Sequence, residues 1–312
     1  MTFLLWLAAL PCLYWTQGVE SAPSLKAAGT ARLCVPPERA EAWRGAGFTT
    51  VPLGEGDLSV RETLLAPGIK VRADRASATR SPWVDANGWR FLRDPSGQFV
   101  YDLPAGRAAL AAAEAYVYGA DAVLKIDPAD LESLGRMMAF LAQLPTRDLP
   151  DVADLAVVDD GSAPLGEVLN LLVRRNLLVR VVKAPSPDFT INVKLGTKEY
   201  PLKEAGEPSA LALKIRRQLT DEQRALRIFG TEAVIGRLTG NGERARLHLL
   251  NYGGRELEGL RVHVRGSFPE GEALVAGAGR VALEDRAVVD GGTEFTIPRL
   301  GAYGVVELLP AR

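Results

Sequence analysis

The chain has 312 residues, of which 47% are hydrophobic and 24% charged, with a formal net charge of -1. This length and composition are typical of two or three globular domains and exclude a disordered chain. Because 37 basic residues are balanced by 38 acidic ones, no overall field attracts a polyanion, and we expect no nucleic-acid partner.

The sequence opens with an apolar run from Phe3 to Trp15. This run is too short to span a bilayer but has the length of the apolar part of a secretory signal. We therefore predict a signal peptide over residues 1–21, a secreted or periplasmic location and no stable membrane span. No Lys or Arg precedes the run, which leaves a retained, buried N-terminal helix as the alternative.

Cleavage after Ser21 would remove Cys12 and leave Cys34 as the single cysteine. A single thiol forms no internal disulfide, so we expect the mature chain to depend on its core for stability. Cys34 lies in an apolar run and is interpreted as a small buried hydrophobic residue, not a nucleophile.

Residues 22–150 alternate strand-like and helix-like patterns. Residues 31–53 predict a strand, a helix and a second strand. An Ala-rich helix follows over 104–120, with Glu114 on its surface, and a further helix over 127–144. Alternation of this kind indicates an α/β region with parallel strands.

Residues 151–232 contain a second strand, helix and strand unit. The apolar strand 154–160 ends in Asp159 and Asp160, and the helix after it is capped near Ser162. This pattern predicts a flavodoxin-like α/β region.

From residue 233 to residue 312 the hydrophobic pattern has a period of two, with turn residues at short intervals. This predicts an antiparallel β-sandwich. With Leu247 and Leu249 facing inward, a hairpin register would place Leu247 opposite Val264 and His248 opposite His263.

The C-terminal stretches "RLHLLNYGGRELEGLRVHVRG" and "VVDGGTEFTIPRLGAYGVVEL" resemble the small β-sandwich that ends many multidomain glycoside hydrolases. The features that match are the "LLNY" strand and the run from Phe295 to Tyr303. In that family the sandwich follows a barrel, so the resemblance implies that 22–150 is a partial or degenerate (β/α) barrel. A full barrel needs about 200 to 250 residues, about twice what this region offers.

The stretch "SPWVDANGWRFLRDP" concentrates aromatic and charged residues. Sugars are held by aromatic faces together with carboxylate, amide and guanidinium groups, and this segment supplies all four. We predict Asp85 as the catalytic carboxylate of a glycoside hydrolase, if the chain is active. The predicted substrate-binding residues around it are Trp83, Asn87, Trp89 and Arg90. The alternative is a structural loop whose tryptophans cap the core.

Asp159 and Asp160 are further candidates for substrate binding, because open α/β sheets bind ligands at the carboxyl ends of their strands. Capping of the following helix is the alternative explanation. The two histidines, His248 and His263, are too few for a zinc site, and we predict no metal. No glycine-rich phosphate loop joins a strand to a helix, so we predict no cofactor.

The sequence therefore predicts an exported protein that resembles glycoside hydrolases and has a carbohydrate ligand, in a degenerate form that binds glycans without cleaving them. The alternative function is a noncatalytic structural or protein-interaction role with an accessory β-sandwich.

Overall fold

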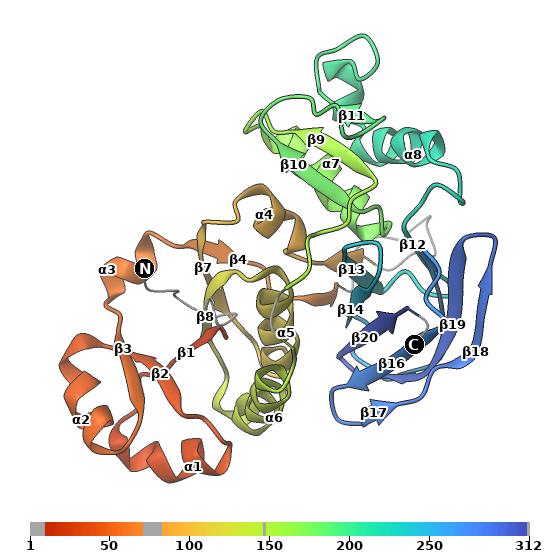
Figure 1. Ribbon diagram of the computed structural model, residues 1–312. Coiled ribbons are helices and arrows are strands. Elements are labelled where there is room, and N and C mark those ends of the chain that lie inside the picture. Colours follow the sequence, from red (N-terminus) through yellow and green to blue (C-terminus); the bar gives the residue numbers. More distant parts are fainter. Residues whose placement is uncertain (1–9, 71–82, 146–147, 311–312) are drawn as a thin grey trace, which may run out of the picture. The chain divides into compact units, whose positions relative to one another are not determined.

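The computed structural model describes residues 10–70, 83–145 and 148–310 (Figure 1). The chain forms two compact units. The first consists of the described residues up to Gly68 and of 94–145, and the second of those in 69–93 and of 148–310. The described residues of 69–93 thus belong to the second unit, although the described chain on both sides of them belongs to the first.

The first unit is built on a parallel sheet with the strand order β3-β2-β1-β8-β7-β4. Its strands are β1 (Cys12–Tyr14), β2 (Arg32–Val35), β3 (Thr49–Pro52), β4 (Glu62–Leu64), β7 (Gln98–Asp102) and β8 (Asp121–Lys125). If the two edge strands β3 and β4 were joined, the order around the closed sheet would be β1-β2-β3-β4-β7-β8, which is the order of these strands along the chain. The sheet therefore corresponds to a barrel that is open between β3 and β4. The predicted partial barrel is confirmed.

The helices of this unit are η1 (Val19–Ser21), α1 (Ala22–Ala27), η2 (Pro37–Arg39), α2 (Ala40–Gly45), α3 (Glu55–Ser59) and α5 (Ala108–Tyr118), which lie between its strands, and η3 (Pro128–Asp130) and α6 (Leu131–Ala142), which follow β8. α5 ends at Gly119, which has the left-handed conformation (φ 66°) that glycine adopts without strain.

Glu114 is fully buried within α5, so the prediction that it lies on the helix surface is wrong. α5 packs against both α6 and β8, which leaves it no solvent-facing side. The Tyr101 hydroxyl donates a hydrogen bond of 2.6 Å to Glu114 Oε2, which satisfies part of the buried carboxylate.

Strand β1 lies inside the sheet, between β2 and β8, and a disulfide joins its Cys12 to Cys34 of β2. Cys34 is therefore paired in a chain that keeps Cys12, whereas the expectation of an unpaired Cys34 concerned a chain cleaved after Ser21. The predicted signal segment 1–21 includes β1, so cleavage before Ala22 would remove a central strand and half of the disulfide.

The parallel part of the second unit is a sheet with the order β10-β9-β11. β9 (Leu155–Val158), α7 (Ala163–Arg174) and β10 (Val179–Val182) form the predicted parallel βαβ unit, and β11 (Asn192–Val193) pairs on the other side of β9. Ser162 caps α7, since its hydroxyl accepts a hydrogen bond from the Leu165 N–H. η4 (Leu202–Gly206) and α8 (Pro208–Gln218) follow.

The segment before Asp94 adds β6 (Trp83–Asp85), which pairs with β5 (Gly68–Lys70), and α4 (Gly88–Arg93). α4 packs against α7. The aromatic and charged residues predicted as a site are therefore placed beside the flavodoxin-like part of the chain, as the yellow-brown α4 and green α7 show in Figure 1.

The C-terminal β-sandwich is confirmed, with sheet orders β12-β15-β19-β18 and β13-β14-β20-β16-β17. Its strands are β12 (Leu226–Ile228), β13 (Val234–Gly240), β14 (Ala245–Asn251), β15 (Leu257–Arg265), β16 (Glu270–Val275), β17 (Gly279–Val281), β18 (Glu284–Val289), β19 (Gly292–Leu300) and β20 (Tyr303–Leu309). Buried residues of both sheets, such as Leu247 and Phe295, form one core between them.

The predicted hairpin register in this sandwich is wrong. β14 and β15 lie in different sheets, so Leu247 pairs with Leu238 and Val306, and not with Val264. His248 lies opposite Val305, whereas His263 lies opposite Glu294. Each of the two strands is paired along both of its edges, and the inward orientation of Leu247 and Leu249 alone could not identify the partners.

Buried side chains join the flavodoxin-like part to the sandwich. Asn176 donates a hydrogen bond of 3.0 Å to the Val234 carbonyl and accepts one of 2.7 Å from the Gly236 N–H. The carboxylate of Asp154 accepts hydrogen bonds from the N–H groups of Leu178 and Ala225. These contacts fix the start of the sandwich against the end of α7.

Candidate functional site

The aromatic and charged segment forms strand β6 and the beginning of α4. Trp83, Asp85 and Trp89 are half-buried, whereas Asn87 is almost fully buried. The Trp83 Nε1–H donates a hydrogen bond of 2.9 Å to Asp85 Oδ1. The segment is therefore neither a sealed core plug nor a fully open loop.

Each tryptophan of this segment has a guanidinium group over its ring. The Arg90 guanidinium carbon lies 4.4 Å from the Trp89 ring centroid, and that of Arg174 lies 4.4 Å from the Trp83 ring centroid. Both are cation–π distances. The indoles thus combine an aromatic surface with a positive charge directly beside it.

An ion pair connects α4 to the carboxyl end of β9. Arg93 Nε donates a hydrogen bond of 2.9 Å to Asp159 Oδ1, and Arg93 Nη2 donates to the Ser162 carbonyl at 2.9 Å. Arg93 was not predicted to bind substrate, but it links the aromatic and charged segment to Asp159, which was. Asp160 is exposed and accepts a hydrogen bond of 2.8 Å from the Ser162 N–H.

The carboxylate of Asp159 is held in its ionised form. Burial raises the pKa of this carboxyl, but the Gly161 N–H and the Arg93 guanidinium outweigh burial and lower the pKa below the usual value of 3.8. Asp159 is thus an anchor for Arg93 and for the turn before α7, whereas the cap of the helix itself is Ser162 and not an aspartate.

α4 and α7 approach each other closely at Gly166. A Cβ at this position would lie 2.9 Å from Cζ3 of Trp89 and 3.0 Å from Nη1 of Arg93. Gly166 is therefore the residue that allows Trp89 to pack directly on the helix backbone.

A pocket of about 430 Å³ opens beside Trp83. Its volume is in the range of small-molecule sites. It is lined by Trp83, Leu171, Arg174, Arg175, Asn176, Ser209, Arg216, Arg224, Ile228, Thr231 and Glu232. Among the predicted substrate-binding residues Trp83 lines this pocket, whereas Asp159 and Asp160 do not.

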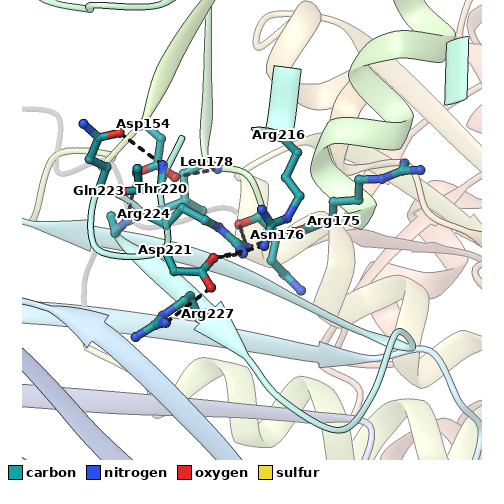
Figure 2. Close-up of polar contacts among 11 residues, drawn as sticks. Asp154, Arg175, Asn176, Leu178, Arg216, Thr220, Asp221, Gln223, Arg224 and Arg227 are labelled. Atoms are coloured by element: carbon teal, nitrogen blue, oxygen red, sulfur yellow. Dashed lines mark hydrogen bonds and ion pairs between the residues drawn. The ribbon is translucent and has the colours of Figure 1, made fainter. Parts of the chain in front are cut away.

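One carboxylate holds several of the surrounding guanidinium groups in place. Asp221 Oδ1 accepts a hydrogen bond of 3.0 Å from Arg216 Nη2. The Asp221 carboxylate also lies 3.9 Å from Arg224 Nη1 and 3.8 Å from Arg227 Nη1. Figure 2 shows Arg216, Arg224 and Arg227 grouped around the Asp221 carboxylate.

This pocket was not predicted from the sequence, because its residues come from segments that are far apart in the chain. The one signal is the pair of adjacent arginines near the end of each of two helices, at Arg174–Arg175 and Arg216–Arg217. Basic residues at helix C-termini are common for electrostatic reasons, so this pattern alone does not indicate a site.

No protein-family model matches the sequence. No curated protein matches it either. Among solved structures, the chain is similar to alpha-L-fucosidase isoenzyme 2 from Paenibacillus thiaminolyticus, with a TM-score of 0.53 and 10% identity. That match covers 72% of this chain and 62% of the fucosidase chain. A rhamnosidase from Novosphingobium sp. PP1Y matches with a TM-score of 0.48 and 10% identity, over 88% of this chain and 38% of the rhamnosidase.

The fold is glycoside hydrolase-like. The chain spans less than two thirds of the length of either solved enzyme. A partial barrel followed by a β-sandwich agrees with the resemblance seen in the sequence. Because the identity is 10%, the similarity to the fucosidase shows the fold and not the activity.

In this glycoside hydrolase-like chain the pocket offers four arginines and a single carboxylate, that of Glu232. Hydrolysis of a glycosidic bond commonly requires two carboxyl groups facing each other across the bond. Among the described residues that line the pocket, no such pair is present.

No group of three or more potential metal ligands occurs among the described histidines, cysteines and acidic residues. Within the same described part of the chain, none of the helices has the length and apolar character needed to cross a membrane.

Proposed function

We propose that this glycoside hydrolase-like chain binds glycans at the surface formed by β6, α4 and the pocket beside Trp83, and does not cleave them. The observation that carries the proposal is the half-buried Trp83, which lines the pocket while its indole N–H bonds to Asp85. An aromatic wall with polar groups at its edge is the combination that sugar rings require.

Asp85 is the residue of this surface that the sequence predicts as the catalytic carboxylate of an active enzyme. Its Oδ1 accepts the hydrogen bond from Trp83, and Asp85 does not line the pocket. The acidic residue that lines the pocket is Glu232. We therefore assign Asp85 to orientation of the Trp83 indole, and not to proton transfer.

We further propose that the protein works in an oxidising compartment, as a secreted or periplasmic protein. The Cys12–Cys34 disulfide supports this location, because thiols of cytosolic proteins are kept reduced. The proposal requires that Cys12 stays in the mature chain, since β1 is buried in the sheet of the first unit.

The proposal is tested by titrating the intrinsic tryptophan fluorescence of the full chain with a panel of neutral and acidic oligosaccharides. We expect saturable changes with at least one glycan, and at least about tenfold weaker binding in Trp83→Ala. Trp43→Phe is the matched control, because Trp43 is fully buried in the first unit. Absence of any saturable response across the panel contradicts the proposal.

Hydrolysis is measured separately with aryl glycosides. We expect no turnover above buffer by the wild-type chain. Turnover that is lost in Asp85→Asn would contradict the noncatalytic assignment and restore Asp85 as a catalytic carboxylate.

A further inference from the structure

The pocket beside Trp83 carries a large excess of positive charge. Its lining includes four arginines and one glutamate, a formal charge of +3. Arg174 and Arg175 come from the end of α7, Arg216 from α8, and Arg224 from the turn before β12. Guanidinium groups from three separate segments thus converge on a single cavity.

Arg224 is the most deeply buried of these cations, with a side chain that is 8% exposed. Its Nη2 donates hydrogen bonds to the carbonyls of Arg175 (3.1 Å) and Asn176 (3.3 Å). Its Nε is enclosed by protein and has no hydrogen-bond partner among the described residues, so the donor that remains for a ligand is Nη1, which lies 3.9 Å from Asp221, beyond hydrogen-bond distance. A buried guanidinium with unused donors is costly unless an acceptor is supplied.

The arginines of the pocket also act on one another. Burial lowers the pKa of Arg224, and the neighbouring Arg216 lowers it further. Burial likewise lowers the pKa of Arg174, with Arg175 as the second cause. An anion in the pocket would relieve this repulsion and supply acceptors at the same time.

We propose that this pocket binds an oxyanion group, and that the group is the carboxylate or sulfate of an acidic saccharide. This inference rests on the proposed glycan binding and names the substrate class. Guanidinium groups match the planar, two-oxygen geometry of a carboxylate and also bind tetrahedral oxyanions.

The neighbouring groups fit the rest of such a ligand. Trp83 gives the cavity an aromatic wall, and the Ser209 hydroxyl and the Asn176 amide line the same cavity. Arg175 Nη2 donates a hydrogen bond of 3.2 Å to Ser209 Oγ, which fixes that hydroxyl at the cavity wall. A charged sugar would therefore place its anion on the arginines and its ring beside the indole.

The experiment is calorimetric titration of the full chain, at constant ionic strength, with trigalacturonate, with its fully methyl-esterified form and with sodium sulfate. Wild type is compared with Arg216→Gln and Arg217→Gln. Arg216 lines the pocket with a side chain that is 33% exposed, so its replacement leaves the core intact. Arg217 is the adjacent exposed arginine on the same helix, does not line the pocket, and serves as the matched control.

We expect trigalacturonate to bind at least about tenfold more tightly than its ester, because a charge-assisted hydrogen bond is lost in the ester. Arg216→Gln should weaken trigalacturonate binding by about tenfold or more, whereas Arg217→Gln should leave it unchanged. Arg224→Gln should have an effect at least as large wherever circular dichroism shows that the variant is folded.

Two outcomes overturn the inference in different ways. Equal binding of acid and ester, unchanged in Arg216→Gln, removes the anion pocket and leaves glycan binding intact. Sulfate binding that depends on Arg216, without binding of either saccharide, identifies a site for a free anion and removes the acidic saccharide, whereas the proposed function is contradicted only by a lack of response across the glycan panel.

Discussion

Arg93 on α4 and Asp159 at the end of β9 form an ion pair of 2.9 Å, with side chains that are 18% and 9% exposed. The same guanidinium donates to the Ser162 carbonyl, so it bonds to both the carboxylate and the turn that starts α7. This pair holds the tryptophan-bearing segment against the flavodoxin-like part of the second unit. Its role is positional, because neither residue lines the pocket beside Trp83, which lies at the other end of α7.

The first prediction concerns the stability of this pair in acid. The folded-state pKa of Asp159 is lowered, so its contribution is fully present above the unfolded pKa of about 3.8 and is lost as the pH falls through the lower folded value. Asp159→Asn should cost about 1 to 3 kcal/mol at neutral pH and flatten the loss of stability below pH 4. Chemical denaturation between pH 2 and pH 7 measures both effects.

Asp160→Asn is the matched control, because Asp160 is exposed and does not contact Arg93 in the described structure. It should keep the acid dependence of the wild type. Equal pH profiles for Asp159→Asn and wild type would contradict the role assigned to this ion pair.

The second prediction concerns Asn176, which has a left-handed backbone conformation (φ 54°) and two hydrogen bonds to β13. Asn176→Ala leaves buried backbone groups without partners and adds backbone strain, so it should lower the free energy of unfolding by about 3 kcal/mol. Asn176→Gly removes the same hydrogen bonds, but glycine adopts the left-handed conformation without strain. In urea unfolding this variant should therefore be less destabilised than Asn176→Ala. Wild-type stability of both variants would contradict this account.

The third prediction concerns the disulfide. Cys12 and Cys34 are 22 residues apart, and a link over a loop of this size stabilises by about 3 kcal/mol in the chain-entropy model. The double variant Cys12→Ser, Cys34→Ser should lose about that much relative to the oxidised wild type. The single variants are matched controls and should lose a similar amount, because either one removes the bond.

Intact mass spectrometry of the exported protein, before and after reduction, tests the same pair directly. We expect a mature N-terminus upstream of Cys12 and a mass gain of two hydrogens on reduction. An N-terminus at Ala22 would show that the working protein lacks β1 and the disulfide.

The fourth prediction concerns the close approach at Gly166. The Cβ of Gly166→Ala would meet Trp89 at 2.9 Å, so the indole must shift, with a cost of about 1 to 3 kcal/mol and a changed tryptophan emission spectrum. Gly206→Ala is the control, because a Cβ there meets nothing within 4 Å. An unchanged spectrum and stability in Gly166→Ala would contradict the packing of α4 on α7.

Local features of the fold were predictable from the sequence. The Ser162 cap, the Gly119 helix end and the parallel strands around α7 each depend on residues within a few positions or within one βαβ unit. The β-sandwich was predictable from its period-two pattern. The partners of its strands were not, because β14 pairs with the distant β20, and alternation alone does not identify a partner.

The candidate site was predictable in part. The aromatic segment is visible as a cluster in the sequence, and Trp83 does line a pocket. The arginines that give this pocket its charge come from α7, α8 and the turn before β12, and only the folded chain brings them together. Burial of Glu114 was missed because an Ala-rich helix carries little periodicity from which to identify its exposed side.

The most direct test of glycan recognition at the pocket is a crystal structure of the full chain grown with trigalacturonate. The account predicts a sugar ring beside the Trp83 indole, with its carboxylate within hydrogen-bond distance of Arg216 and Arg224. A saccharide bound at a surface remote from Trp83, with these arginines unchanged and without a ligand, would contradict it.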